Sequence, residues 1–279
     1  MSKWLDQALF IDHDVTLAAA GSAAAVGLVL QAAEFAKERQ LLLEDFFSWK
    51  VIRSRYYITL RRPLTRAVID ILCASEVFVP ALGIQAVLAV AFPFVVAGGS
   101  GAMAGFIALS VFLLQCLMKF RILVGLDGSD QMQAVVWAGL TAMSFGGEGS
   151  HLSMAAGLFI SGQLLLSYVV AGWAKLISTT WRSGRAIPAI VKTTTYGSPF
   201  FHRCFSLPGV GFLTAWWVML FESFSPLALI FGRAGAAVLF VVGMSFHLGV
   251  AVVMGLWSFL WAFLACFPVL FYTVGILME

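Results

Sequence analysis

The chain has 279 residues, of which 61% are hydrophobic and 11% charged, and its mean hydropathy is +0.95. Soluble domains carry roughly 25% charged residues, and 17 basic and 14 acidic side chains cannot cover a chain of this length in water. The bilayer is therefore its main solvent, which excludes disordered, collagen-like, disulfide-scaffold and soluble-enzyme classes.

The apolar runs predict an all-α fold, a polytopic transmembrane helical bundle of about eight spans, with seven or nine as the alternatives. A transmembrane helix needs about 20 mostly apolar residues, and we expect one integral membrane domain over 1–279. The first run is too long, and its flank too acidic, for a cleaved signal peptide. The second is long enough to be tilted or broken at Pro80. The predicted spans are 15–36, 67–97, 102–123, 131–147, 152–177, 209–231, 234–255 and 256–277.

Two segments are plainly not membrane spans. Segment 37–66 holds eight basic residues, with apolar residues between them at near-helical spacing. This pattern is typical of a basic amphipathic segment at an anionic lipid interface, and an ordinary solvated loop is the alternative. Segment 178–207 is rich in Thr, Ser, Gly, Pro and Arg, and we expect a polar loop.

Basic residues cluster on one predicted side of the membrane. With eight spans and an outside N-terminus, the inside segments 37–66, 119–130 and 175–203 hold 15 of the 17 Lys and Arg residues. The positive-inside rule therefore predicts that these segments face the cytoplasm. One miscounted helix would reverse half of this arrangement.

Several charged residues fall inside the predicted spans, where each costs at least ~2.5–3.5 kcal/mol and so tends to face an interior. Lys175 lies near a helix end, and snorkelling to the headgroups is its alternative explanation. Asp70 follows Arg66 by four residues, and an i,i+4 ion pair at the interface is a simple alternative explanation for it. Glu76 and Glu222 each precede a proline by four residues, so each either satisfies freed backbone groups or lines a site.

A histidine and a tyrosine belong to the same group of polar residues. His247 alone in an apolar span is more often a helix–helix hydrogen-bonding residue than a catalyst, and it shares a helix face with Gly243. Tyr168 and Lys175 are seven residues apart, which places them on one face. Gly172 between them allows another backbone to approach.

The segment 125–132, GLDGSDQM, carries several polar groups just before a span. Asp127 or Ser129 can cap the next helix, and Asp130 falls in its first turn, where the helix dipole favours an anion. The spacing does not fit a calcium loop. The four cysteines form no CxxC pair, so no metal site is expected. The chain contains no recognisable nucleic-acid module.

Two motifs resemble a known family. Residues 168–186 contain Tyr168, then AGWAKL, then a W-x-x-G-x-A pattern from Trp181, and residues 246–268 begin FHLG and continue through MGL to Pro268. In this order they resemble the HTTM family of vitamin K-dependent carboxylase-like membrane domains. The resemblance covers roughly residues 110–275, and segment 125–132 is similar to a loop in bacterial relatives.

The resemblance implies a site and a cofactor. It implies that Lys175 is the base in the oxygenation of a quinol of the vitamin K type and that His247 belongs to the same site. A desolvated lysine can be neutral enough to accept a proton. We expect Tyr168, Trp181 and Glu222 in the cavity wall. The family's site faces the lumen, whereas the charge pattern places the Lys175 end inside, and the large lumenal domain of the carboxylase has no counterpart in this chain.

Two functional hypotheses follow. The first is an HTTM-type membrane protein, in the bacterial cytoplasmic membrane, that performs quinol-dependent chemistry or modifies a peptide delivered by a partner. The second is a non-catalytic membrane subunit that scaffolds or helps to mature another protein. Membrane lipid is a partner in both, and nucleic acid in neither. A transporter ranks third, because no internal repeat is visible.

Overall fold

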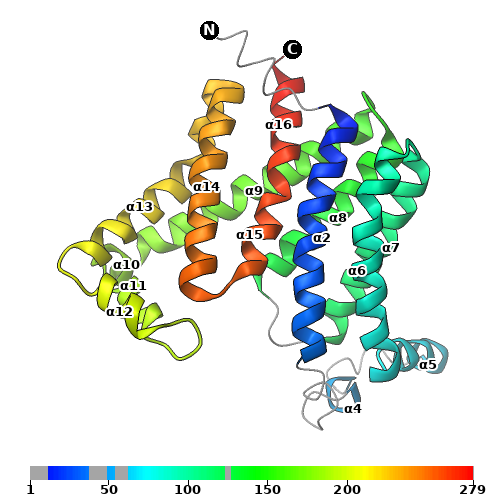
Figure 1. Ribbon diagram of the computed structural model, residues 1–279, viewed down its shortest axis with the longest axis horizontal. Coiled ribbons are helices and arrows are strands. Elements are labelled where there is room, and N and C mark those ends of the chain that lie inside the picture. Colours follow the sequence, from blue (N-terminus) through cyan, green and yellow to red (C-terminus); the bar gives the residue numbers. More distant parts are fainter. Residues whose placement is uncertain (1–11, 38–48, 54–61, 123–126, 279) are drawn as a thin grey trace.

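The computed structural model describes residues 12–37, 49–53, 62–122 and 127–278. These residues form helices and connecting turns, with no strand among them, which confirms the all-α membrane bundle (Figure 1). Within the described part, six helical stretches are long and apolar enough to cross a membrane. Several of the long helices run side by side, whereas the helix His151–Ile177 crosses them obliquely (Figure 1).

Each of the eight predicted spans corresponds to a helical segment. Two features explain why eight runs appear as six apolar stretches. The continuous stretch Val210–Met254 holds two helices that run in opposite directions, and α8 is too polar to be included. The segments are α2 (His13–Lys37), α6 (Ser75–Ala97), α7 (Gly101–Arg121), α8 (Gly128–Gly146), α9 (His151–Ile177), α13 (Val210–Phe224) with the 3-10 helix η2 (Ser225–Phe231), α14 (Gly232–Met254), and α15 (Trp257–Leu264) with α16 (Cys266–Leu277).

The long second run is broken, but not at Pro80. Helix α5 (Pro63–Leu72) ends at Cys73, and the extended backbone of Ala74 starts α6 in a new direction. Pro80 and Pro93 both lie inside α6. A proline removes only one backbone hydrogen bond, so its position in the sequence does not by itself locate a break.

Small residues set the distances between helices. A Cβ atom on Gly105 would lie 2.8 Å from the Phe145 ring, so α7 and α8 approach closely at this glycine. The sequence Gly101–Gly105 therefore acts as a packing motif. In the core, the fully buried Trp137 meets Phe92 edge to face, with ring centroids 5.4 Å apart.

The two ends of the bundle differ in charge. Helix α2 begins and α16 ends at one end of the molecule, and α4 (Trp49–Ile52), α5 and the α14–α15 turn lie towards the other (Figure 1). Most of the described basic residues belong to elements at this second end, whereas Arg233 lies at the start of α14. The basic residues in elements at this second end are Lys37, Arg53, Arg62, Arg66, Lys119, Arg121, Arg182, Arg185, Lys192 and Arg203. We refer to this end as the basic end.

Only parts of the predicted interfacial segment 37–66 are described, because 38–48 and 54–61 lie outside the described residues. In the described part, Asp70 accepts a hydrogen bond from Trp49 Nε1 at 2.6 Å and pairs with Arg53 at 3.1 Å. Arg66 also reaches Asp70, at 3.7 Å, which confirms the expected i,i+4 pair. The lipid-interface role of this segment stays a prediction.

The expected polar loop 178–207 is instead three short helices, α10 (Thr179–Arg182), α11 (Ala186–Val191) and α12 (Pro199–Phe205). They pack beside the ends of α9 and α13. The polar average composition of 178–207 did not indicate the apolar sequence AIPAIV of α11, whose Val191 is buried. Burying these side chains against the bundle stabilises helices that their polar neighbours alone would not.

Candidate functional site

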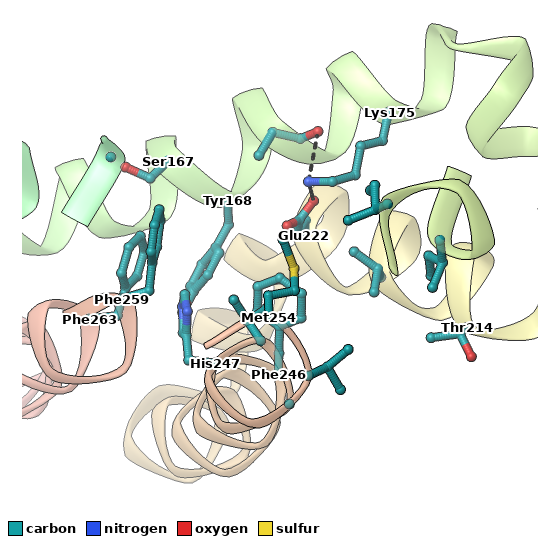
Figure 2. Close-up of a pocket in the computed structure, with 18 of the residues that line it drawn as sticks. Ser167, Tyr168, Lys175, Thr214, Glu222, Phe246, His247, Met254, Phe259 and Phe263 are labelled. Atoms are coloured by element: carbon teal, nitrogen blue, oxygen red, sulfur yellow. Dashed lines mark hydrogen bonds and ion pairs between the residues drawn. The ribbon is translucent and has the colours of Figure 1, made fainter. Parts of the chain in front are cut away.

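A cavity of about 530 Å³ lies between α9, α13, α14 and α15. The first turn of α8 and the short helices α10–α12 complete its wall. All five residues expected in a site line this cavity, although they come from four elements: Tyr168, Lys175, Trp181, Glu222 and His247. Figure 2 shows four of them around the cavity.

Lys175 and Glu222 form an ion pair in the cavity wall. Their Nζ and Oε2 atoms are 2.5 Å apart, and the side chains are 19% and 4% exposed (Figure 2). The Lys175 ammonium also lies 3.5 Å from the carbonyl oxygen of Ala171 and 5.3 Å from the centre of the Trp181 ring. Lys175 therefore points inward and does not snorkel. The Lys175 side chain is therefore paired with a carboxylate, whereas the resemblance implied a lysine without such a partner.

The close approach of α9 and α13 depends on Gly172. A Cβ atom at this position would lie 2.5 Å from the Ser223 amide nitrogen and 2.9 Å from the Glu222 carbonyl carbon. Both are backbone atoms, so no side-chain rotation could make room. The expected approach of another backbone at Gly172 is confirmed, and it is this approach that places Glu222 beside Lys175, one helical turn further along α9.

The proline after Glu222 has a local effect of its own. Pro226 has no N–H to bond the Glu222 carbonyl four residues earlier, and it is the second residue of η2. The Ser225 hydroxyl donates to that carbonyl at 3.1 Å. The freed backbone oxygen is thus satisfied by Ser225, and the Glu222 carboxylate remains available to Lys175.

Tyr168 and His247 form the second polar pair of the cavity. Tyr168 Oη and His247 Nε2 are 3.0 Å apart, and both residues are 2% exposed. This bond joins α9 to α14, as expected for a helix–helix hydrogen bond in lipid. The His247 ring lies over Phe263 with centroids 4.1 Å apart. Its Nδ1 atom is buried and has no hydrogen-bond partner among the residues that the structure describes.

The remaining wall is largely apolar and aromatic. Phe259 and Phe263 lie beside the Tyr168–His247 pair, and the Phe246 ring contacts His247 (Figure 2). Trp217 also lines the cavity. The short helix α11 contributes Ile187, Ile190 and Val191. These wall residues were not predicted as site residues. The spacing of the α11 residues within an otherwise polar segment is the signal that could have identified them.

The polar segment before α8 has a structural role. The Asp127 carboxylate accepts the amide hydrogens of Ser129 and Asp130, and the Asp130 carboxylate accepts the amide of Asp127, so the two form a capping box. Asp130 also accepts a hydrogen bond from the Gln31 side chain of α2. Neither aspartate lines the cavity, whereas Gly128 and Gln131 between and beside them do.

Two other charged residues lie away from the cavity. Glu76 is exposed in the first turn of α6, and Asp70 belongs to the ion-pair cluster at the basic end. Within the described residues, no group of three or more His, Cys, Asp or Glu side chains is arranged to hold a metal ion.

Together, the fold and the cavity define the class: a polytopic helical membrane protein with an internal apolar cavity that holds two buried polar pairs. Comparisons of the chain with protein-family models, with curated proteins and with solved structures found no match.

Proposed function

We propose that this chain is an HTTM-type membrane protein that binds a quinol of the vitamin K type in the cavity and exchanges a proton with it. The observation that carries the proposal is the convergence of two polar pairs, Lys175–Glu222 and Tyr168–His247, inside one apolar cavity. Buried ionisable groups in the spans of a membrane protein are costly and typical of functional sites.

The cavity suits a flat, largely apolar ring with a few oxygen atoms. Ligand sites are commonly lined by hydrophobic and aromatic side chains, with a small number of polar groups that fix orientation. Phe246, Phe259 and Phe263 provide faces for a ring. The unpartnered Nδ1 of His247 provides a polar atom whose burial costs about 1–3 kcal/mol unless a ligand or water meets it.

Proton exchange would use Lys175 and Glu222 together. A quinol supplies ring hydroxyl groups that can release protons. The Glu222 carboxylate can accept a proton at Oε2, and the Lys175 ammonium then remains to balance negative charge left in the cavity. Both side chains are largely buried, and the low polarity of their surroundings would strengthen both electrostatic effects. Tyr168 and His247 would orient the ring through their hydrogen-bonding atoms.

The proposed location is the bacterial cytoplasmic membrane, with the basic end of the bundle inside. The clustering of Lys and Arg at that end supports this orientation. The short helices α10–α12 beside the cavity would then lie on the cytoplasmic side.

Binding tests the proposal directly. The protein, purified in lipid nanodiscs, is titrated anaerobically with 2-methyl-1,4-naphthoquinol while tryptophan fluorescence is followed, because Trp181 and Trp217 line the cavity. We expect saturable quenching, and weaker binding in Glu222→Gln and Tyr168→Phe. Lys192→Met, which removes an exposed charge from a residue that does not line the cavity, is the control. Quenching that does not saturate, or equal affinity in all four proteins, would contradict the proposal.

A non-catalytic membrane subunit is the second candidate, and helix α5 favours it. This helix buries none of its residues, and Leu64 and Ile71 are 78% and 62% exposed. A partner protein at the membrane surface could cover them. Stable co-purification of one partner that is lost in Leu64→Ser and Ile71→Ser variants, together with indifference to the cavity variants, would support this candidate.

A further inference from the structure

The segment between α9 and α13 carries basic residues and no acidic ones. From residue 149 to residue 221 the chain contains no aspartate or glutamate. Segment 178–209 holds four basic residues, Arg182, Arg185, Lys192 and Arg203, and all four are exposed. None of them forms an ion pair with a carboxylate within the described part of the chain. The positive charge of this segment is therefore open to an anionic partner.

The three short helices of the segment meet at one glycine. A Cβ atom on Gly211, in the first turn of α13, would lie 2.9 Å from the carbonyl oxygens of both Gly184 and Phe205. One arginine lies on each side of Gly184, and a third lies two residues before Phe205. The packing at Gly211 thus gathers three arginines from α10, α11 and α12 around the start of α13.

Exposed apolar side chains lie beside these arginines. Phe200 is 67% exposed and precedes Arg203 by one turn of α12, and Leu207, in the turn after α12, is 58% exposed. Leu213, in the first turn of α13, is 68% exposed. Basic and large apolar residues in one short helical segment are typical of an element in the membrane interface. We call this surface the α10–α12 face, and its residues are Arg182, Arg185, Phe200, Arg203, Leu207 and Leu213.

The neighbouring spans place the α10–α12 face at the level of the lipid headgroups. Helix α9 ends at Ile177 and α13 begins at Val210, and both belong to apolar stretches long enough to cross a membrane. The segment between them therefore leaves and re-enters the bilayer on the same side. Figure 1 shows α10–α12 beside these two helix ends, on the opposite side of the molecule from α5.

Two tryptophans in the same region agree with this level. Trp181 belongs to α10, and the Trp216 Nε1 atom of α13 donates a hydrogen bond to the Arg182 carbonyl oxygen at 3.2 Å. Tryptophan is enriched where a membrane protein meets the headgroups. Basic residues at this level attract anionic lipids.

The inner side of the same segment is part of the cavity wall. Ile187, Ile190 and Val191 of α11 and Phe205 of α12 line the cavity. A molecule bound to the α10–α12 face would therefore contact the outer side of the segment that covers the cavity, and would stabilise its position against the bundle.

From this combination of charge, apolar exposure and level, we propose that the α10–α12 face binds the headgroups of anionic phospholipids. The three arginines contact the phosphate groups, and the side chains of Phe200, Leu207 and Leu213 lie among the upper parts of the acyl chains. An acidic protein surface would also match the charge, but the bilayer covers the exposed apolar side chains without any further partner. The inference does not depend on which ligand the cavity binds.

Hydrogen exchange and lipid binding test the inference. The full chain is placed in nanodiscs of phosphatidylcholine alone, or of an equal mixture with phosphatidylglycerol that has the same acyl chains, and amide exchange is followed by mass spectrometry. We expect exchange in 178–209 to be slower in the mixture. Native mass spectrometry in a mild detergent then compares the two lipids, and we expect phosphatidylglycerol to bind more tightly than phosphatidylcholine.

A matched pair of double variants locates the site. Arg182→Gln with Arg203→Gln should weaken phosphatidylglycerol binding by about tenfold, since each basic residue near an anionic surface contributes on the order of fivefold. The same variant should lose the slower exchange in 178–209. Lys37→Gln with Arg62→Gln removes two exposed basic residues of the basic end outside the face and should change both results little. Arg182→Lys with Arg203→Lys keeps the charge and should keep most of the binding. All of these positions are exposed, so the unfolding midpoints should stay close together.

Three outcomes would overturn the inference. If the Lys37 and Arg62 variant loses as much binding as the Arg182 and Arg203 variant, binding follows net charge and not this face. If phosphatidylglycerol slows exchange elsewhere but not in 178–209, the lipid binds at another site. If neither measurement distinguishes phosphatidylglycerol from phosphatidylcholine, lipid is not the occupant, and an acidic protein surface becomes the better explanation of the exposed arginines.

Discussion

Removing Lys175 should destabilise the protein more than removing the charge of its partner, because the two side chains differ in burial. Glu222 is 4% exposed and Lys175 19% exposed. Lys175→Met leaves a buried carboxylate without a counterion, and breaking a buried pair in this way costs about 3–5 kcal/mol. Glu222→Gln leaves an ammonium that keeps the Ala171 carbonyl and the Trp181 ring and can turn towards the surface. We expect its cost to be about 1.5–3 kcal/mol, the value of a hydrogen bond to a charged group.

Thermal unfolding in one detergent, at neutral pH and one scan rate, measures the difference. In proteins near this size, a loss of 1 kcal/mol in stability lowers the unfolding midpoint by about 2–4 °C. The midpoint of Lys175→Met should therefore fall by on the order of 10 °C, and that of Glu222→Gln by clearly less. The double variant Lys175→Met with Glu222→Gln should recover part of the Lys175→Met loss, because a neutral pair carries no buried charge.

The control for this series is Lys192→Met, which removes an exposed lysine of the same type and should shift the midpoint little. If the unfolding midpoint of Lys175→Met falls no further than that of Glu222→Gln, the reasoning from burial is refuted. A double variant less stable than Lys175→Met alone would show that the cost is not that of an unpaired carboxylate.

Three further predictions concern packing, hydrogen bonding and orientation. Gly172→Ala should cost about 1–3 kcal/mol by forcing α9 and α13 apart, whereas Gly162→Ala, where a Cβ meets nothing within 4 Å, should not destabilise; equal unfolding midpoints would contradict the clash. Tyr168→Phe should cost about 0.5–1.5 kcal/mol by removing the bond to His247, and unchanged stability would show that this bond is energetically neutral. In a bacterial host, a reporter enzyme active only outside the cytoplasm should be active when fused after α16, since α16 ends opposite the basic end; an inactive but expressed fusion would reverse the orientation.

The interfacial role of segment 37–66 and the family resemblance both stay predictions. The first depends on residues largely outside the described part of the chain. The second depends on two short motifs, and the comparisons neither support nor oppose it. The structure does bring together the residues that these motifs contain, since Lys175 and His247 line one cavity.

The membrane environment, the helical class and the positions of most spans could be predicted from composition and apolar runs. These are properties of short stretches of chain, because each segment must by itself supply enough apolar length and satisfy its own backbone hydrogen bonds in lipid. The cost of burying charge likewise singled out Lys175 and Glu222 before any partner was known. Local spacing also limited the cap of α8 to Asp127 or Ser129, and the structure shows that Asp127 is the cap.

Only the tertiary structure decided which polar groups meet. Lys175 and Glu222 are separated by 47 positions, and Tyr168 and His247 by 79. Their pairing depends on the angles and distances at which α9, α13 and α14 pack. Close backbone contacts, such as the one at Gly172, determine these angles and distances. The folding of 178–207 over the cavity has the same origin, because weak local helices become stable only against a surface that distant segments build.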